Sequence, residues 1–162
     1  MWGKAKPIPD GFHRITPSLV VKDGARAIDF YKAAFGAELR SVHRSENAKI
    51  VHAELLIGDS ILMLSDEFPG AQCQAPQTGS LPSVILHIYV ENADETFNRA
   101  VTAGASAIMP MMDAFWGDRY GQVQDPFGHR WSIAVRKEDL SSKEVEKRGK
   151  EAFAKMAAKP GA

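Results

Sequence analysis

The order of apolar and polar positions along the chain occurs twice. Two stretches match in order and in spacing: residues 18–39 continuing into 51–64, and residues 85–108 continuing into 120–135. Val21 corresponds to Val90 at an offset of 69, and Gly58 corresponds to Gly128 at an offset of 70. A near-constant offset between two matching stretches is the signature of an internal repeat. The chain therefore contains two copies of one structural unit.

Each copy has the pattern of a β-α-β-β-β unit. It opens with a β-branched apolar run that is typical of a strand. Asp23 in the first copy and Asn92 in the second supply the side-chain acceptor that begins a helix, and Gly36 and Gly104 stand where these helices should end. Apolar residues at three- and four-residue spacing predict that each helix buries one face. The residues expected in that buried face are Ile28, Tyr31, Phe35 and Phe97.

The chain is expected to divide into five segments. These are an N-terminal arm (1–14), a first module (15–64), a linker or loop (65–83), a second module (84–136), and a C-terminal helix with its tail (137–162). The linker is rich in Pro, Gly, Ser and Gln and lacks periodicity, which is typical of a loop. Ser141 and Glu144 have the spacing of a capping box, which predicts where the last helix begins.

Composition argues against several classes of function. The 20 basic and 20 acidic side chains give a net charge of zero, whereas proteins that bind nucleic acid by releasing counterions need a basic surface. No apolar run is long enough to span a bilayer or to form a signal peptide. The one cysteine, Cys73, excludes a disulfide within the chain. We therefore predict a cytoplasmic protein that binds neither nucleic acid nor membrane.

Four segments carry a resemblance to a known superfamily. They read LVVKDGARAIDFYKAAFGA, HAELLIGDSILMLSDE, HIYVENADETFNRAVTAGA and WGDRYGQVQDPFGHRWSIA. These segments resemble the vicinal oxygen chelate superfamily of glyoxalases, bleomycin-resistance proteins and dioxygenases, and in particular its PhnB-like branch. The resemblance implies an α+β fold in which two βαβββ modules form a curved mixed sheet around a cleft, with the helices outside and a C-terminal helix added. It also implies a homodimer.

The resemblance further implies a position for a divalent metal, held in the cleft by the first and last strands of each module. Counted from the V-x-D/N steps and the turn glycines, the four ligand positions hold Thr16, Leu62, Ile85 and Ser132. Hydroxyl and hydrocarbon side chains are poor ligands for divalent metals, so we expect no metal there and no other cofactor. A register slip of two residues would instead bring His87 to a ligand position.

Alternation along the strands places four polar side chains toward the expected cleft. His52 and Glu54 point away from the apolar side of their strand, and His87 and Tyr89 share one side of another strand. The two imidazoles and the carboxylate could bind a displaced metal or act as acid and base. These residues, with Tyr89, are also candidates for contact with a ligand in the absence of a metal. Alternatively, they form a hydrogen-bonded polar lining or lie on the solvated side of a sheet.

A second group of candidates lies in the segment AFWGDRYGQVQDPFGHRW. Trp116 and Tyr120 offer flat apolar surfaces with a hydrogen-bonding group at the tip. Arg119 offers a planar fork that suits a carboxylate or a phosphate. We consider these three residues candidates for ligand contact. The alternative for Arg119 is a salt bridge with Asp118 or Asp125.

The leading hypothesis is a glyoxalase/bleomycin-resistance-like protein that binds a small molecule in its cleft without the standard metal. The first alternative is a noncanonical lyase or isomerase, or a metal-dependent enzyme, that uses His52, Glu54 and His87. The second alternative is a protein-interaction module that acts through its dimer surface and C-terminal helix. A fold of this kind serves several functions, and the sequence leaves open whether the protein is an enzyme.

Overall fold

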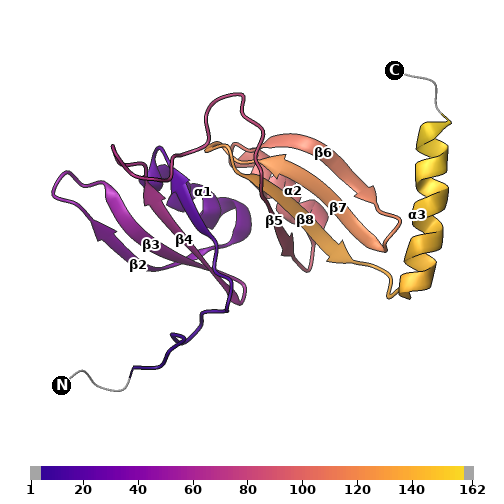
Figure 1. The fold of residues 1–162 in the computed structure, drawn as a ribbon, viewed down its shortest axis with the longest axis horizontal. Helices are drawn as coiled ribbons and strands as arrows, with labels where there is room; N and C mark the ends of the chain where they lie inside the picture. Colours follow the sequence, from indigo (N-terminus) through magenta and orange to yellow (C-terminus); the bar gives the residue numbers. More distant parts are fainter. Residues whose placement is uncertain (1–4, 159–162) are drawn as a thin grey trace.

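The computed structural model describes residues 5–158 and confirms the α+β class, with the predicted β-α-β-β-β order in both modules. The first module consists of β1 (Ser18–Val21), α1 (Gly24–Phe35), β2 (Glu38–Arg44), β3 (Ile50–Ile57) and β4 (Ser60–Asp66). The second consists of β5 (Ile85–Tyr89), α2 (Ala93–Thr102), β6 (Ser106–Asp113), β7 (Asp118–Gln124) and β8 (Arg130–Arg136). The chain continues into α3 (Ser142–Ala157) beside the second module (Figure 1).

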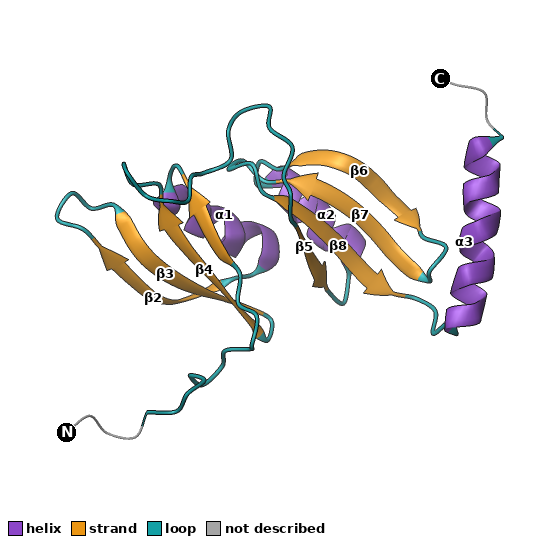
Figure 2. Ribbon diagram, viewed as in Figure 1, coloured by secondary structure: helices purple, strands orange, loops and turns teal. Residues whose placement is uncertain are grey.

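The strands form two mixed sheets of four strands each within the described residues. The first sheet has the order β1-β4-β3-β2, and the second has the order β5-β8-β7-β6. In each sheet the first strand runs parallel to the last strand of its module, and the other pairs are antiparallel. The two sheets lie side by side with α1 and α2 behind them (Figure 2). Each sheet therefore has one face covered by a helix and one face, its open face, on the opposite side.

The helix boundaries follow from the capping residues that the sequence offers. The Asp23 side chain accepts a hydrogen bond from the Arg26 backbone N–H, and α1 ends at Gly36, which has a φ of 67°. Because that φ lies in the left-handed region, glycine suits the position better than other residues. The Asn92 side chain caps α2 in the same way. The predicted starts of both helices are confirmed, and α2 ends at Ala103, one residue before the predicted Gly104.

One hydrophobic core runs through both modules. Ile28, Tyr31, Phe35 and Phe97 are all buried in it, as predicted. The ring of Phe35, at the end of α1, lies 4.6 Å from the ring of Trp131 on β8, centroid to centroid. The Arg99 side chain of α2 also donates to the backbone carbonyl of Ala34 in α1. The helix of the first module is thus packed against a strand and a helix of the second.

A buried carboxylate joins the modules at the turn between β7 and β8. Asp125 is 4% exposed, and its Oδ2 accepts from the Tyr31 hydroxyl at 2.7 Å and from the Trp131 indole N–H at 2.9 Å. Its Oδ1 accepts from the backbone N–H groups of Phe127 and His129, both at 2.9 Å. Burial, and after it the neighbouring Asp125 carboxylate, raises the pKa of Tyr31 well above its ordinary value.

We expect this raised pKa to destabilise the protein at alkaline pH. Above pH 10, the ordinary pKa of tyrosine, the Tyr31 phenol ionises in the unfolded chain but stays protonated in the folded chain. The free energy of unfolding then falls by up to about 1.4 kcal/mol for each pH unit through this residue. Tyr31→Phe removes this contribution. Urea unfolding of both proteins from pH 8 to 11 should therefore show their stability difference shrinking above pH 10, and a constant difference would contradict the prediction.

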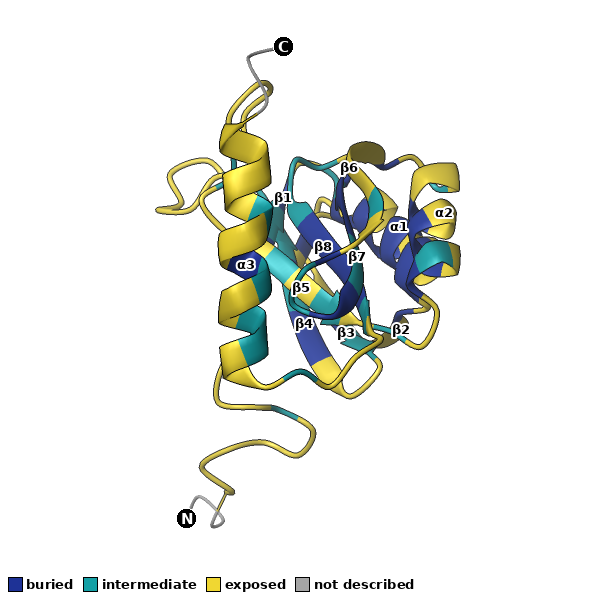
Figure 3. Cartoon of the chain, turned by 90° about the vertical axis from the view of Figure 1, so that its right-hand side faces the viewer, coloured by how far each residue is buried: buried dark blue, intermediate teal, exposed yellow. Residues whose placement is uncertain are grey.

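The C-terminal helix α3 has few contacts with the rest of the chain. It begins after Ser141, whose hydroxyl accepts from the Glu144 backbone N–H, as predicted, while the Glu144 carboxylate pairs with Arg148. Gly149 is the one buried residue of α3 and lies against the Phe115 ring. Figure 3 shows the helix exposed along most of its length. Over residues 5–158, no helix has the length and apolar character needed to cross a membrane.

Candidate ligand-binding face

The open face of the second sheet carries most of the candidate side chains. His87 on β5 pairs with Ser132 on β8, which pairs in turn with Gln122 on β7. In the same way, Tyr89 pairs with Ala134, which pairs with Tyr120. Residues at alternate positions share this face. The same alternation adds Ile85, Ser106, Met109, Met112, Asp118, Gln124, Arg130 and Arg136 to the face.

Four rings gather at one end of this face and form what we call the aromatic wall: His87, Tyr89, Trp116 and Tyr120. The centroid of the His87 ring lies 4.8 Å from that of Tyr89 and 6.1 Å from that of Tyr120. The Trp116 and Tyr120 centroids are 5.1 Å apart, with the rings edge to face. The structure therefore brings together four of the seven candidates identified from the sequence.

A nearly buried carboxylate fixes two of these rings. Oδ2 of Asp118 accepts from the Tyr89 hydroxyl at 3.0 Å and from the Trp116 indole N–H at 2.9 Å. The hydrogen bond to Asp118 raises the pKa of Tyr89, because it favours the protonated phenol. The Gln122 amide N–H donates to the Tyr120 hydroxyl oxygen, which leaves the Tyr120 proton available to an acceptor on a ligand. The wall is thus a preorganised apolar surface with hydrogen-bonding groups at its edge.

Two residues of the aromatic wall, His87 and Tyr89, line a large groove. This groove has a volume of about 1300 Å³ and lies between the two modules. His87 and Tyr89 line it from β5, and Thr16 and the β3–β4 hairpin line it from the first module. Binding sites for small molecules are concave and combine apolar walls with a few polar groups. The groove and the wall together have this character.

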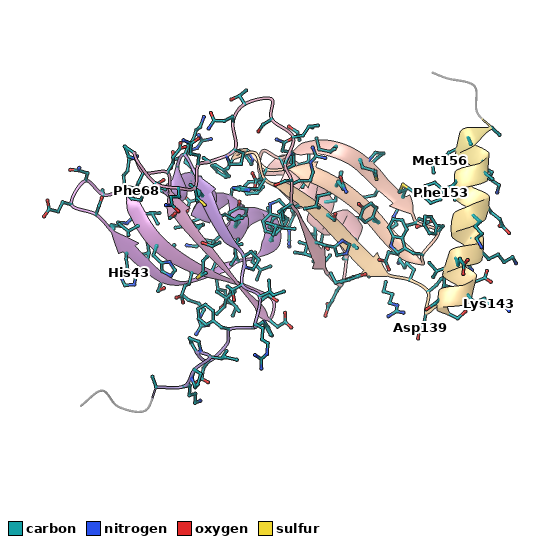
Figure 4. The ribbon with its side chains drawn as sticks, in the orientation of Figure 1. His43, Phe68, Asp139, Lys143, Phe153 and Met156 are labelled. Atoms are coloured by element: carbon teal, nitrogen blue, oxygen red, sulfur yellow. The ribbon has the colours of Figure 1, made fainter. Side chains whose placement is uncertain are left out.

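His52 and Glu54 lie apart from the aromatic wall, on the open face of the first sheet. Nε2 of His52 is 3.3 Å from Oε1 of Glu54, and the His43 ring lies beside the His52 ring with 6.2 Å between centroids. His43 belongs to β2, at the end of the molecule opposite α3 (Figure 4). Within one chain, the structure does not bring His52 and Glu54 together with His87, which lies on the other sheet. Across residues 5–158, no three His, Cys, Asp or Glu side chains are grouped so that they could hold a metal ion.

Arg119 does not share the open face with Tyr120, because adjacent residues of a strand point to opposite sides. Its Nε and Nη2 donate to the two carboxylate oxygens of Asp94 in α2, at 3.0 and 2.8 Å. Nη1 lies 3.4 Å from Oδ1 of Asp113. The hydrogen bond from Arg119 lowers the pKa of Asp94. The partners of Arg119 are thus Asp94 and Asp113, not the Asp118 or Asp125 considered from the sequence, and the ion pair holds α2 on the covered face of the sheet.

The structure corrects one of the four positions derived for the standard metal site. Leu62 lies in the hydrophobic core on the covered face of the first sheet, and not toward an open face. The β3–β4 hairpin turns through residues 58–59 alone, whereas the β7–β8 turn spans 125–129, so the turn glycines are not equivalent. Met63, which pairs with Ser18 as Ser132 pairs with His87, is the counterpart of Ser132.

The corrected set of positions does not suit a divalent metal. It combines Thr16, Met63, Ile85 and Ser132, which offer two hydroxyls, a thioether and a hydrocarbon side chain. The side chains that most often hold divalent cations in proteins carry imidazole, carboxylate, thiolate or amide carbonyl groups, and this set contains none of them. The residues present therefore do not fit the metal that the resemblance implies for catalytic members.

Three residues of the face were missed from the sequence: Asp118, Gln122 and Arg130. A signal for the first two was present, because Asp118 and Gln122 stand two residues to either side of Tyr120 and so share its face. Arg130 stands two residues before Ser132 and therefore shares the face of Ser132. Alternation alone does not indicate that the Asp118 carboxylate accepts hydrogen bonds from both the Tyr89 hydroxyl and the Trp116 indole.

This chain is similar in sequence to one superfamily and to a mycobacterial protein. The model of the Glyoxalase/Bleomycin resistance protein/Dioxygenase superfamily matches residues 11–133. An uncharacterized protein of Mycobacterium bovis is 38% identical over 135 residues, which covers 82% of this chain and 89% of that protein. The match to the family model ends before α3, so the C-terminal helix lies outside it.

Solved structures have the same fold. The crystal structure of TioX from Micromonospora sp. ML1 has a TM-score of 0.62 and 28% identity, and the similarity covers 76% of this chain and 98% of TioX. The PhnB protein from Bacillus cereus has a TM-score of 0.60 and 19% identity, and the similarity covers 76% of this chain and 99% of that protein. At that identity the second comparison supports the fold alone.

Proposed function

Because the chain belongs to the Glyoxalase/Bleomycin resistance protein/Dioxygenase superfamily, we propose that it binds a small organic molecule on the open face of its second sheet, without a metal at the standard positions. The observation that carries this proposal is the aromatic wall with its Asp118 anchor. Rings that are held in place before a ligand arrives lose little conformational freedom on binding. A flat or extended apolar ligand would cover them and find hydrogen-bonding groups at their edge.

We also propose that the binding cleft is completed by a second copy of the chain in a C2 homodimer. The open faces of both sheets lie on the side away from α1 and α2, so one chain does not fold its first sheet over its second. Large apolar side chains on the open face of the second sheet are exposed, with Ile85 at 47% and Met112 at 43%. Exposed apolar patches of this kind mark interaction surfaces, and a two-fold axis would form two identical clefts.

In such a dimer, the open face of the first sheet of one copy would cover the second sheet of the other. The His52–Glu54 pair and His43 would then stand opposite the aromatic wall. This arrangement would bring His52, Glu54 and His87 to one cleft from two chains. The polar groups of the first sheet would supply hydrogen bonds to the ligand, and the aromatic groups of the second sheet would supply apolar contact.

Binding of an uncharged fluorescent probe tests the proposed ligand face. We expect the methyl ester of dansylaminoundecanoic acid to bind saturably, with a rise in dansyl emission. Tyr120→Ala removes one ring of the wall and should weaken binding about tenfold, as expected for the loss of one aromatic contact. Val101→Ala on α2, on the covered side of the second sheet, is the matched control and should bind like the wild type. Equal affinity in the wild type and Tyr120→Ala, or no saturable binding at all, would refute the proposed ligand face.

A further inference from the structure

We propose that the ligand of the second sheet is an organic anion, whose acidic group pairs with Arg130 while its apolar body lies on the aromatic wall. The inference rests on the proposed function and adds the chemical class of the ligand. It draws on two features of the open face: an arginine without a partner among the described residues, and the position of that arginine relative to the rings.

Arg130 lies on the open face at the start of β8. Its cross-strand neighbours are Ile85 on β5 and Gln124 on β7. The next residue, Trp131, points into the core, so the Arg130 side chain points to the opposite side. The arginine is therefore on the same face as the aromatic wall, four residues along β8 from Ala134, which pairs with Tyr120. That spacing corresponds to about 13 Å along the strand.

The guanidinium of Arg130 has no partner among residues 5–158. No ion pair or side-chain hydrogen bond joins it to another described residue, and its Nε is buried without an acceptor. Three other arginines form ion pairs: Arg119 with Asp94, Arg136 with Asp139, and Arg148 with Glu138. Arg14, Arg26 and Arg40 have no ion pair among the described residues either, but their side chains are exposed, whereas Nε of Arg130 is buried. Burying a polar N–H without a hydrogen bond is unfavourable. An acidic group on a ligand would supply the missing acceptor and the missing charge.

No carboxylate of the open face competes for this position. Asp118 is the acidic residue of the face, but it lies six residues along β7 from Gln124, the neighbour of Arg130. Its Oδ2 is already engaged by Tyr89 and Trp116. An anion at Arg130 therefore meets a cation and neutral groups, with the nearest negative charge of the face about 20 Å away along the strand. A planar guanidinium pairs well with a carboxylate or phosphate.

Three dansyl probes that differ in charge test this inference. They are dansylaminoundecanoic acid, its methyl ester, and the cationic amine dansylcadaverine. In the wild type we expect the acid to bind about tenfold or more tightly than the ester, the lower range for a hydrogen bond to a charged group. Added salt should weaken the binding of the acid and leave the binding of the ester unchanged. Arg130→Gln should reduce the affinity for the acid to that for the ester.

The matched control is Arg26→Gln, which removes an exposed arginine from α1 on the covered side of the first sheet. It should leave the preference for the acid unchanged. Equal affinity for acid and ester, or tighter binding of dansylcadaverine than of the acid, would overturn the inference and leave the proposed function intact. Failure of all three probes to bind would instead refute the proposed function, and the inference with it. Should Arg130→Gln not fold, the acid–ester comparison and its salt dependence in the wild type still decide the question.

Discussion

Replacing Asp125 with alanine is expected to lower the free energy of unfolding by about 3–5 kcal/mol. The substitution removes the acceptor of two buried side-chain donors, the Tyr31 hydroxyl and the Trp131 indole, and of two backbone N–H groups in the turn. Each buried donor left without a partner costs about 1–3 kcal/mol. Urea unfolding, followed by far-UV circular dichroism, measures the change.

Asp59→Ala provides the matched control, because Asp59 is the exposed aspartate in the corresponding turn of the first module. Its side chain accepts a hydrogen bond from the neighbouring Ser60 hydroxyl and from no buried group. We expect this substitution to change the free energy of unfolding by less than about 0.5 kcal/mol, as is usual at exposed positions. Similar small changes for Asp125→Ala and Asp59→Ala would show that the Asp125 network does not hold the modules together.

Light scattering is expected to give about twice the 17.7 kDa mass of one chain at micromolar protein. Met112→Glu should convert the protein to a monomer, because it places a charge without a partner beside Tyr120, on the face proposed to be covered in the dimer. Val101→Glu is the control, since Val101 is also partly exposed but belongs to α2 on the covered side of the second sheet. A monomer mass for the wild type would contradict the dimer. Equal masses for the two variants would also contradict the proposed dimer.

The sequence predicts the elements of this fold well because the signals for them are local. The start of α1 depends on Asp23 and its end on Gly36, and both residues act on backbone groups within one helical turn. The buried stripe of α1 likewise follows from spacing within twelve residues. Because the unit is duplicated, equivalent capping signals occur twice, at Asp23 before α1 and at Asn92 before α2.

The arrangement of the site depends on distant pairs, which local patterns do not specify. Arg119 pairs with Asp94, 25 positions earlier, and not with a neighbour in its own segment. His52 and His87 lie on different sheets, and the contacts of α1 with α2 and Trp131 that join the two modules link residues far apart in the sequence. The error at Leu62 has another cause: the two hairpins differ in length, so one glycine was matched to the wrong position.

The way the two modules share their core has a consequence for the history of the duplication. A single module of this kind would expose the rings that now meet across the boundary, Phe35 and Tyr31 on one side and Trp131 on the other. It would also leave the Tyr31 hydroxyl without its Asp125 acceptor. An ancestor with one module would therefore have needed a second polypeptide to cover this surface. Within one chain the two units cover each other at any protein concentration, because their association is intramolecular.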